Sequence, residues 1–111
     1  MDVKQFSIWL VRLEQNPIGH EQGGNRPFFV ISGSEYNRNS GTPIGFLLST
    51  SVKKSKNRFS VAASETSHIN VSQIRTLDIS RFIREMGVLG KKTHDLVMEK
   101  FNKEILQING E

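Results

Sequence analysis

The chain is built from short apolar runs of strand length, separated by segments rich in Gly, Asn and Ser. A run of four to eight residues in which apolar and polar positions alternate is typical of a strand, whereas a helix needs a longer stripe with a period of 3.6. The runs cover residues 6–13, 28–31, 43–48, 59–63 and 68–77. This pattern predicts a mainly β chain of short antiparallel strands, the first of them buried on both faces.

Three segments between the runs are predicted to be connections. Residues 18–26 hold three glycines among polar residues, and residues 32–41 are rich in Gly, Ser and Asn. Residues 51–58 contain four basic side chains and no acidic one, which is typical of an exposed loop. Long loops in a compact domain are usually functional, so the first and third segments are candidates for a site.

Helical signals are confined to the C-terminal third of the chain. Asp78 is suited to cap a short helix that runs through Met86, and Thr93 is suited to cap the last helix. Residues 97, 101, 105 and 108 are apolar and form one stripe on that last helix. The predicted fold class is therefore α+β and mainly β, a small and partly open barrel of antiparallel strands with a C-terminal helix, in a single domain over residues 1–111.

Composition excludes several classes of site and favours an anionic partner. The chain has no cysteine, which rules out disulfides, thiolate metal sites and a Cys nucleophile. Residues 1–13 carry charges and no uninterrupted apolar core, so they predict neither a signal peptide nor a membrane span, and a cytoplasmic location is expected. A net charge of +4 favours nucleic acid or an acidic protein segment as partner.

Four motifs, in the same order along the chain, resemble those of the MazF/PemK/Kid toxins. They are Gly-His-Glu-Gln-Gly-Gly-Asn-Arg-Pro at 19–27, Tyr-Asn-Arg at 36–38, Leu-Ser-Thr-Ser at 48–51 and Gln-Ile-Arg-Thr-Leu-Asp at 73–78. The resemblance implies an SH3-like barrel, a homodimer, and cleavage of single-stranded RNA by attack of a ribose 2′-hydroxyl. It also implies silencing by an acidic antitoxin, with operator DNA bound only through that antitoxin.

The resemblance assigns the leading catalytic role to Arg26. A guanidinium can hold a phosphate with two hydrogen bonds and stabilise the charge that develops on it. Ser49 falls where the family usually has a catalytic threonine, and Thr50 follows it, so either hydroxyl could bind a phosphate oxygen. His20 matches a histidine that assists catalysis in Kid-like members, although a solvated loop histidine is an equal alternative.

The remaining site candidates are assigned to RNA binding. Glu21 could also orient Arg26 or hold the loop, Arg75 could instead form a structural ion pair, and the lysines could simply be solvated. Phe46 and Phe59 could stack bases, but a place in the core is favoured for each. The predicted substrate-binding residues are Glu21, Gln22, Lys53, Lys54, Lys56, Gln73 and Arg75.

The chain also departs from the Kid-like pattern. Asn70 and Ser72 stand where Kid-like members have an arginine and an aspartate, and neither can act as an ionised base. Ser7 replaces an acidic residue that is usual near the first strand. The base for proton abstraction therefore stays open between His20, a loop carboxylate and water.

No metal or other cofactor is expected, because the three histidines lie far apart in sequence without paired carboxylates. Two other classes of function remain open. One is a gyrase-poisoning binder like CcdB, which shares the predicted fold, and the other is a catalytically impaired homologue that binds RNA or protein. The motif ending in Arg26 favours the nuclease, since a gyrase binder has no need to hold a phosphate.

Overall fold

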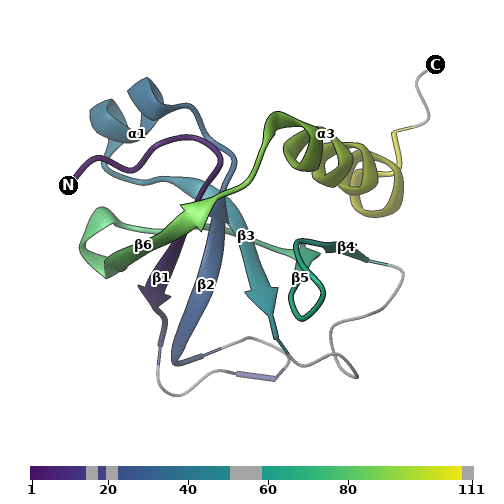
Figure 1. The fold of residues 1–111 in the computed structure, drawn as a ribbon, viewed down its shortest axis with the longest axis horizontal. Coiled ribbons are helices and arrows are strands. Elements are labelled where there is room, and N and C mark those ends of the chain that lie inside the picture. The colour runs from purple at the N-terminus through teal and green to yellow at the C-terminus, as the bar shows by residue number, and fades with distance from the viewer. Residues whose placement is uncertain (15–17, 20–22, 51–58, 109–111) are drawn as a thin grey trace.

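A six-stranded sheet and four helical segments make up the computed structural model, which describes residues 1–14, 18–19, 23–50 and 59–108 (Figure 1). In chain order the segments are β1 (Ser7–Arg12), β2 (Asn25–Val30), α1 (Ser34–Ser40), β3 (Ile44–Ser49), β4 (Ser60–Ala62), β5 (His68–Thr76), the 3₁₀ turn η1 (Ile79–Arg81), β6 (Phe82–Val88), α3 (Lys91–Lys100) and the π-helical turn η2 (Phe101–Leu106).

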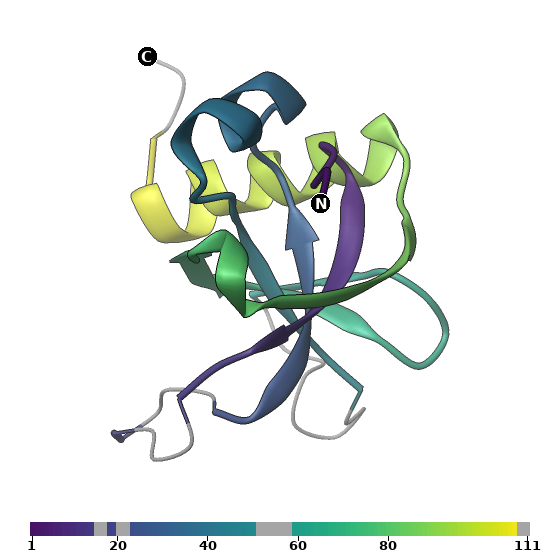
Figure 2. The ribbon, with the colours of Figure 1, turned by 90° about the vertical axis from the view of Figure 1, so that its left-hand side faces the viewer.

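All neighbouring strands of the sheet are antiparallel, in the order β4-β5-β3-β2-β1-β6. The pairing of β1 with β6 and that of β3 with β5 both contain register shifts, which bend and twist a sheet. Figure 2 shows the resulting curl, with strands crossing at large angles. In the described residues β4 and β6 remain edge strands, so this is the predicted mainly β, barrel-like fold with a C-terminal helix, and its sheet is not fully closed.

Two hydrophobic clusters occupy the two faces of this curled sheet. Phe28 and Phe29 are adjacent in β2 and point to opposite faces, one into each cluster. We call the first the inner cluster; its buried members are Val3, Trp9, Val11, Leu13, Phe28, Val30, Leu47, Leu77 and Phe82. The second, the helix-side cluster, consists of Phe29, Phe46, Leu48, Ile69, Val71, Val97 and Phe101, so α3 and η2 cover this face.

Strand β1 is less buried than the sequence predicted. Its side chains on the inner face, Ser7, Trp9 and Val11, are buried, whereas Ile8 and Leu10 on the other face are half-buried. Trp9 is therefore core, as expected, and its indole N–H donates to the Ser7 hydroxyl at 3.0 Å. Ser7 thus has a structural partner in Trp9.

The helix predicted from Asp78 to Met86 is wrong beyond its first turn. Asp78 does act as an N-cap, accepting a hydrogen bond from the Ser80 backbone N–H at 2.9 Å. The turn it caps is η1, however, and the chain then continues as β6, which pairs with β1. This segment forms a strand because it pairs with β1, some 75 positions earlier in the sequence. The local spacing of apolar residues cannot reveal such a distant partner.

A second correction concerns residues 32–41, predicted as an irregular connection, where the structure has helix α1. This helix ends at Gly41, whose φ of 68° is the left-handed cap conformation that glycine favours. Its buried Asn37 donates to the Val3 carbonyl at 2.9 Å and to the Ser32 carbonyl at 3.2 Å. Contacts to distant backbone stabilise this seven-residue helix, which is too short to be stable alone.

The C-terminal helix begins earlier than predicted. Gly90 is the N-cap of α3, so Thr93 lies inside the first turn. Val97 and Phe101 of the predicted stripe are buried and Ile105 packs against them, while Ile108 is 56% exposed. No helix formed by the described residues is long and apolar enough to cross a membrane.

Candidate functional site

Arg26 lies on a strand, and this corrects the prediction that it belongs to the preceding loop. Strand β2 begins at Asn25, and Arg26 pairs with Val11 of β1. Its Nε donates to the Gly23 carbonyl at 3.4 Å, and it forms no ion pair within the described part of the chain. The half-buried guanidinium is therefore fixed by the sheet, with its two terminal nitrogens available to an anion.

Ser49 is the last residue of β3, the strand next to β2. The two strands pair Phe28 with Leu47, and continuing this register by two residues brings Arg26 opposite Ser49. Figure 1 shows that β2 begins and β3 ends at the same end of the sheet, away from α1 and α3. Thr50 follows Ser49 and is exposed at that end.

A third polar side chain, which sequence reasoning missed, completes this arrangement. His68 is the first residue of β5, pairs with Ser49, and is only 8% exposed. The adjacent pair, Leu48 with Ile69, belongs to the helix-side cluster, so Ser49 and His68 face the other way. Arg26 shares this inner face with its partner Val11. We call Arg26, Ser49 and His68, from three neighbouring strands, the polar row.

Asn70 and Ser72, where the resemblance implies an arginine and an aspartate, are joined by hydrogen bonds. The Asn70 side-chain oxygen accepts from the Ser72 hydroxyl at 2.6 Å and from the Ser72 backbone N–H at 3.0 Å. Neither group is ionisable, so they provide no charge for catalysis.

Gln73 and Arg75 lie away from the polar row. Arg75 pairs with Gly45, four residues from Ser49 along β3, which corresponds to about 13 Å at 3.3 Å per residue. A register shift separates this part of β5 from His68. Both side chains are half-buried, and the structure does not bring them together with Arg26.

Asp78, which ends the same motif, has a pKa below its ordinary value of 3.8. The cause is hydrogen bonding to Asp78 from the side chain and the backbone of Ser80.

Several predicted site residues lie outside the described part of the chain. They are His20, Glu21, Gln22, Lys53, Lys54 and Lys56. Phe46 is fully buried and Phe59 packs against the helix-side cluster, so both are core residues, as favoured from the sequence.

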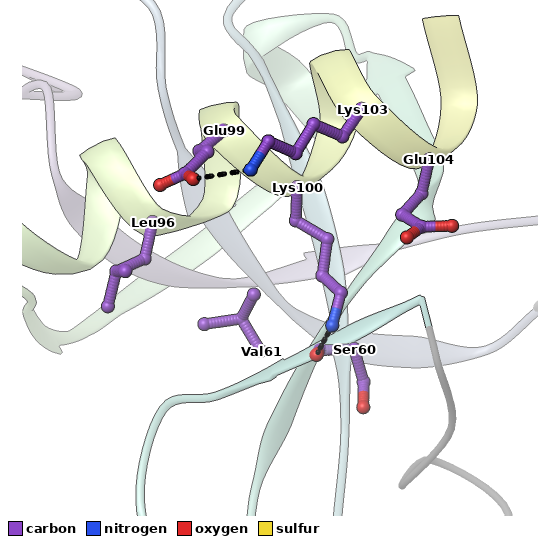
Figure 3. Close-up of a pocket in the computed structure, with 7 residues that line it drawn as sticks. All are labelled: Ser60, Val61, Leu96, Glu99, Lys100, Lys103 and Glu104. Carbon is purple, nitrogen blue, oxygen red and sulfur yellow. Dashed lines mark hydrogen bonds and ion pairs between the residues drawn. The ribbon is translucent and has the colours of Figure 1, made fainter. Parts of the chain in front are cut away.

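A hollow of about 380 Å³ lies on the helix side of the sheet, apart from the polar row (Figure 3). Its charged groups have partners, since Lys103 pairs with Glu99 at 3.1 Å and Lys100 donates to the Ser60 carbonyl at 3.3 Å. It is lined by Ser60, Val61, Leu96, Glu99, Lys100, Lys103 and Glu104. In the residues that the structure covers, no three His, Asp or Glu side chains form a group that could hold a metal ion.

Comparisons with known proteins agree with the fold. The model of a family described as PemK-like, MazF-like toxin of type II toxin-antitoxin system matches residues 4–105. No curated protein matches the chain significantly.

Solved structures of MazF proteins share this fold over nearly their whole length. MazF from Deinococcus radiodurans is 21% identical, with a TM-score of 0.79 over 97% of this chain and 99% of that one. A MazE-MazF structure from the same organism is 23% identical, with a TM-score of 0.76 and coverage of 97% and 99%. A mycobacterial endoribonuclease in complex with its cognate antitoxin is 15% identical, with a TM-score of 0.72 and coverage of 96% and 97%.

Proposed function

Because the chain belongs to the family of PemK-like, MazF-like toxins of type II toxin-antitoxin systems, we propose that it is an endoribonuclease that cleaves single-stranded RNA at a short recognition sequence. Cleavage of mRNA would inhibit growth. The placement of Arg26 and Ser49 on neighbouring strands, at one end and on one face of the sheet, is the observation that carries this proposal.

The reaction we propose uses the substrate's own nucleophile. A ribose 2′-hydroxyl attacks the adjacent phosphorus, the bond to the 5′ oxygen breaks, and a cyclic phosphate and a free 5′-hydroxyl result. The protein then needs only to transfer protons and to stabilise the charge on the pentacoordinate phosphorus. Arg26 supplies two N–H donors to the phosphate oxygens, and a hydroxyl of Ser49 or Thr50 supplies a further hydrogen bond. No step in this scheme requires a metal ion.

We propose further residues as RNA contacts beyond this centre. His20 is proposed to assist proton transfer, and the basic segment to bind phosphates before and after the scissile bond. The proposed contacts are Glu21, Gln22, Lys53, Lys54, Lys56, Gln73 and Arg75.

We also propose an acidic antitoxin as protein partner. Solved relatives are described as MazE-MazF structures and as an endoribonuclease in complex with its cognate antitoxin. The net charge of +4 suits an acidic antitoxin segment. We further propose that the chain is a cytoplasmic homodimer that meets operator DNA only through the antitoxin.

Cleavage of a long single-stranded RNA by the purified protein, in buffer containing EDTA, tests the nuclease proposal. We expect discrete cuts that share a short sequence, with cyclic phosphate and 5′-hydroxyl ends. A DNA strand of the same sequence is the matched control and should stay intact, because it lacks the 2′-hydroxyl. A protein that binds the RNA but never cuts it would contradict the proposal.

One observation favours a second candidate, a catalytically impaired RNA-binding homologue. Asn70 and Ser72 hydrogen-bond to each other where the resemblance implies charged groups. Neither side chain is ionisable, so this pair supplies no base. The same RNA experiment distinguishes the two, since binding without cleavage supports the impaired homologue. No feature of the described residues favours the gyrase-binding alternative.

A further inference from the structure

Among the described residues, no side chain or backbone group hydrogen-bonds to the ring of His68, which is buried. It is 8% exposed, and its ring makes no hydrogen bond, ion pair or ring contact with any residue that the structure describes. An unsatisfied buried polar group costs stability, so its presence calls for an explanation, and a catalytic role is one of the few physical explanations. An apolar side chain would suit this position better if packing were its only purpose.

The position of His68 indicates what it acts on. It lies directly across from Ser49, and continuing the β2–β3 register places Arg26 across from Ser49 on the other side. A hydroxyl between an imidazole and a guanidinium can pass a proton to the first while the second holds the phosphate. His68 thus neighbours Ser49 but its ring does not hydrogen-bond to it in the free protein, so proton transfer requires the Ser49 hydroxyl to turn toward the imidazole when RNA binds. His68 itself is too buried to meet RNA directly.

We propose that His68 is the proton acceptor of the cleavage reaction, acting through the Ser49 hydroxyl, and this inference rests on the proposed nuclease function. As the 2′ oxygen bonds to phosphorus, its proton moves to the Ser49 oxygen and the Ser49 proton moves to a ring nitrogen of neutral His68. The bond from phosphorus to the 5′ oxygen breaks, and that oxygen takes a proton from water. His68 then returns its proton to solvent.

The neighbours of His68 on the paired strands carry no charge. Its partner on β4 is Ala62, its partner on β3 is Ser49, and Asn70 and Ser72 follow on its own strand. Three described charged residues lie on the inner face: Arg26 at the end that holds His68, Arg75 opposite Gly45, and Glu85 opposite Trp9. A guanidinium stays protonated throughout the working pH range. Because a protonated imidazole cannot accept a further proton, we expect the reaction to slow in acid.

His68 acts through Ser49, so it is a positioning residue, and the test must separate this role from a structural one. We would measure kcat and KM of wild type, His68→Asn and His68→Gln on a short fluorogenic RNA from pH 5 to 9. We expect kcat to fall by about 100-fold or more, with KM nearly unchanged and the acidic limb of the pH profile lost. Circular dichroism checks that each variant is folded.

Two matched variants complete the experiment. His94 lies on α3, where its ring stands edge-on to Phe6 at 4.9 Å, so His94→Asn should keep the wild-type pH profile. His20→Asn tests the rival base in the Gly-rich segment. If His20→Asn removes the acidic limb while folded His68 variants keep it, the proposal is overturned, although the nuclease function stands. If wild type itself never cuts RNA, the proposed function has failed instead.

A measurement on the wild-type protein covers the case in which both His68 variants fail to fold. The ring signals of His68 and His94 are followed by NMR from pH 5 to 9, with and without an RNA whose scissile 2′-hydroxyl is methylated. We expect the His68 ring signals to change when this RNA binds, and those of His94 to stay constant. Unchanged His68 ring signals would refute the proposal.

Discussion

Gly45 packs directly against the backbone of Phe29: a Cβ atom on residue 45 would lie 2.0 Å from the Phe29 carbonyl oxygen. It would also lie 2.9 Å from the ring of Phe28. Because β2 and β3 pair at this point, neither neighbour can move without separating the strands.

Gly45→Ala should therefore destabilise the protein by about 3 kcal/mol, the upper part of the range for overpacked cores. Urea unfolding followed by circular dichroism measures the change. Gly90→Ala is the matched control, since nothing lies within 4 Å of a Cβ at Gly90, and it should cost less than about 1 kcal/mol. Equal stability of the two variants would show that β2 and β3 do not approach as closely as described.

Arg26→Ala should reduce kcat for RNA cleavage by about 10²–10³-fold, because it removes donors aimed at the developing charge. The fold should remain intact, since the side chain is half-buried and its hydrogen bond is to Gly23. Arg12→Ala controls for loss of positive charge, because Arg12 is exposed on the adjacent strand β1. Wild-type cleavage by the Arg26 variant would remove Arg26 from the reaction.

Replacing Lys53, Lys54 and Lys56 together by alanine should weaken RNA binding and flatten its salt dependence. Each phosphate contact to a single strand contributes about 0.7 to the slope of log K against log salt, so the slope should fall by about 2. Binding is measured at several KCl concentrations in the Arg26→Ala background, in which cleavage is expected to be slow. A slope equal to that of the parent would mean that these lysines are merely solvated.

Asp78→Ala should lower stability at neutral pH and have no effect in strong acid. Hydrogen bonds from Ser80 hold the pKa of Asp78 below 3.8 in the folded chain. The carboxylate therefore stabilises the fold above its ordinary pKa, and this contribution is lost as pH falls through the lowered folded value. Urea midpoints of wild type and variant, compared from pH 7 down to pH 3, should converge. A constant difference would show that the charge of Asp78 plays no part.

The strands could be predicted because alternation is a local property, while errors arose where distant partners decide the structure. Predicted runs at 43–48 and 68–77 match β3 and β5 to within one residue at each end. Asp78 was correctly identified as a capping residue, but it caps η1. The pairing of the following strand β6 with β1 is absent from any local pattern. Likewise, α1 depends on Asn37 reaching the backbone of Val3.

The candidate site was likewise predictable where local motifs reveal a residue, and not where distant strand pairing brings residues together. Arg26 and Ser49 were found through motifs, whereas their proximity follows from strand pairing that the sequence does not contain. His68 was visible only as one member of an alternating strand, with no sign that its neighbour across the sheet would be Ser49. The one available signal was that His68 begins this strand on the face opposite the aliphatic residues Ile69 and Val71.

The anchoring of Val3 by Asn37 ties the start of the chain to α1, while the polar row sits at the far end of the sheet (Figure 1). A fluorophore or affinity handle joined ahead of Met1 would consequently project away from bound RNA. Single-molecule recordings of strand scission could thus be made on tethered protein without the tether obstructing the substrate.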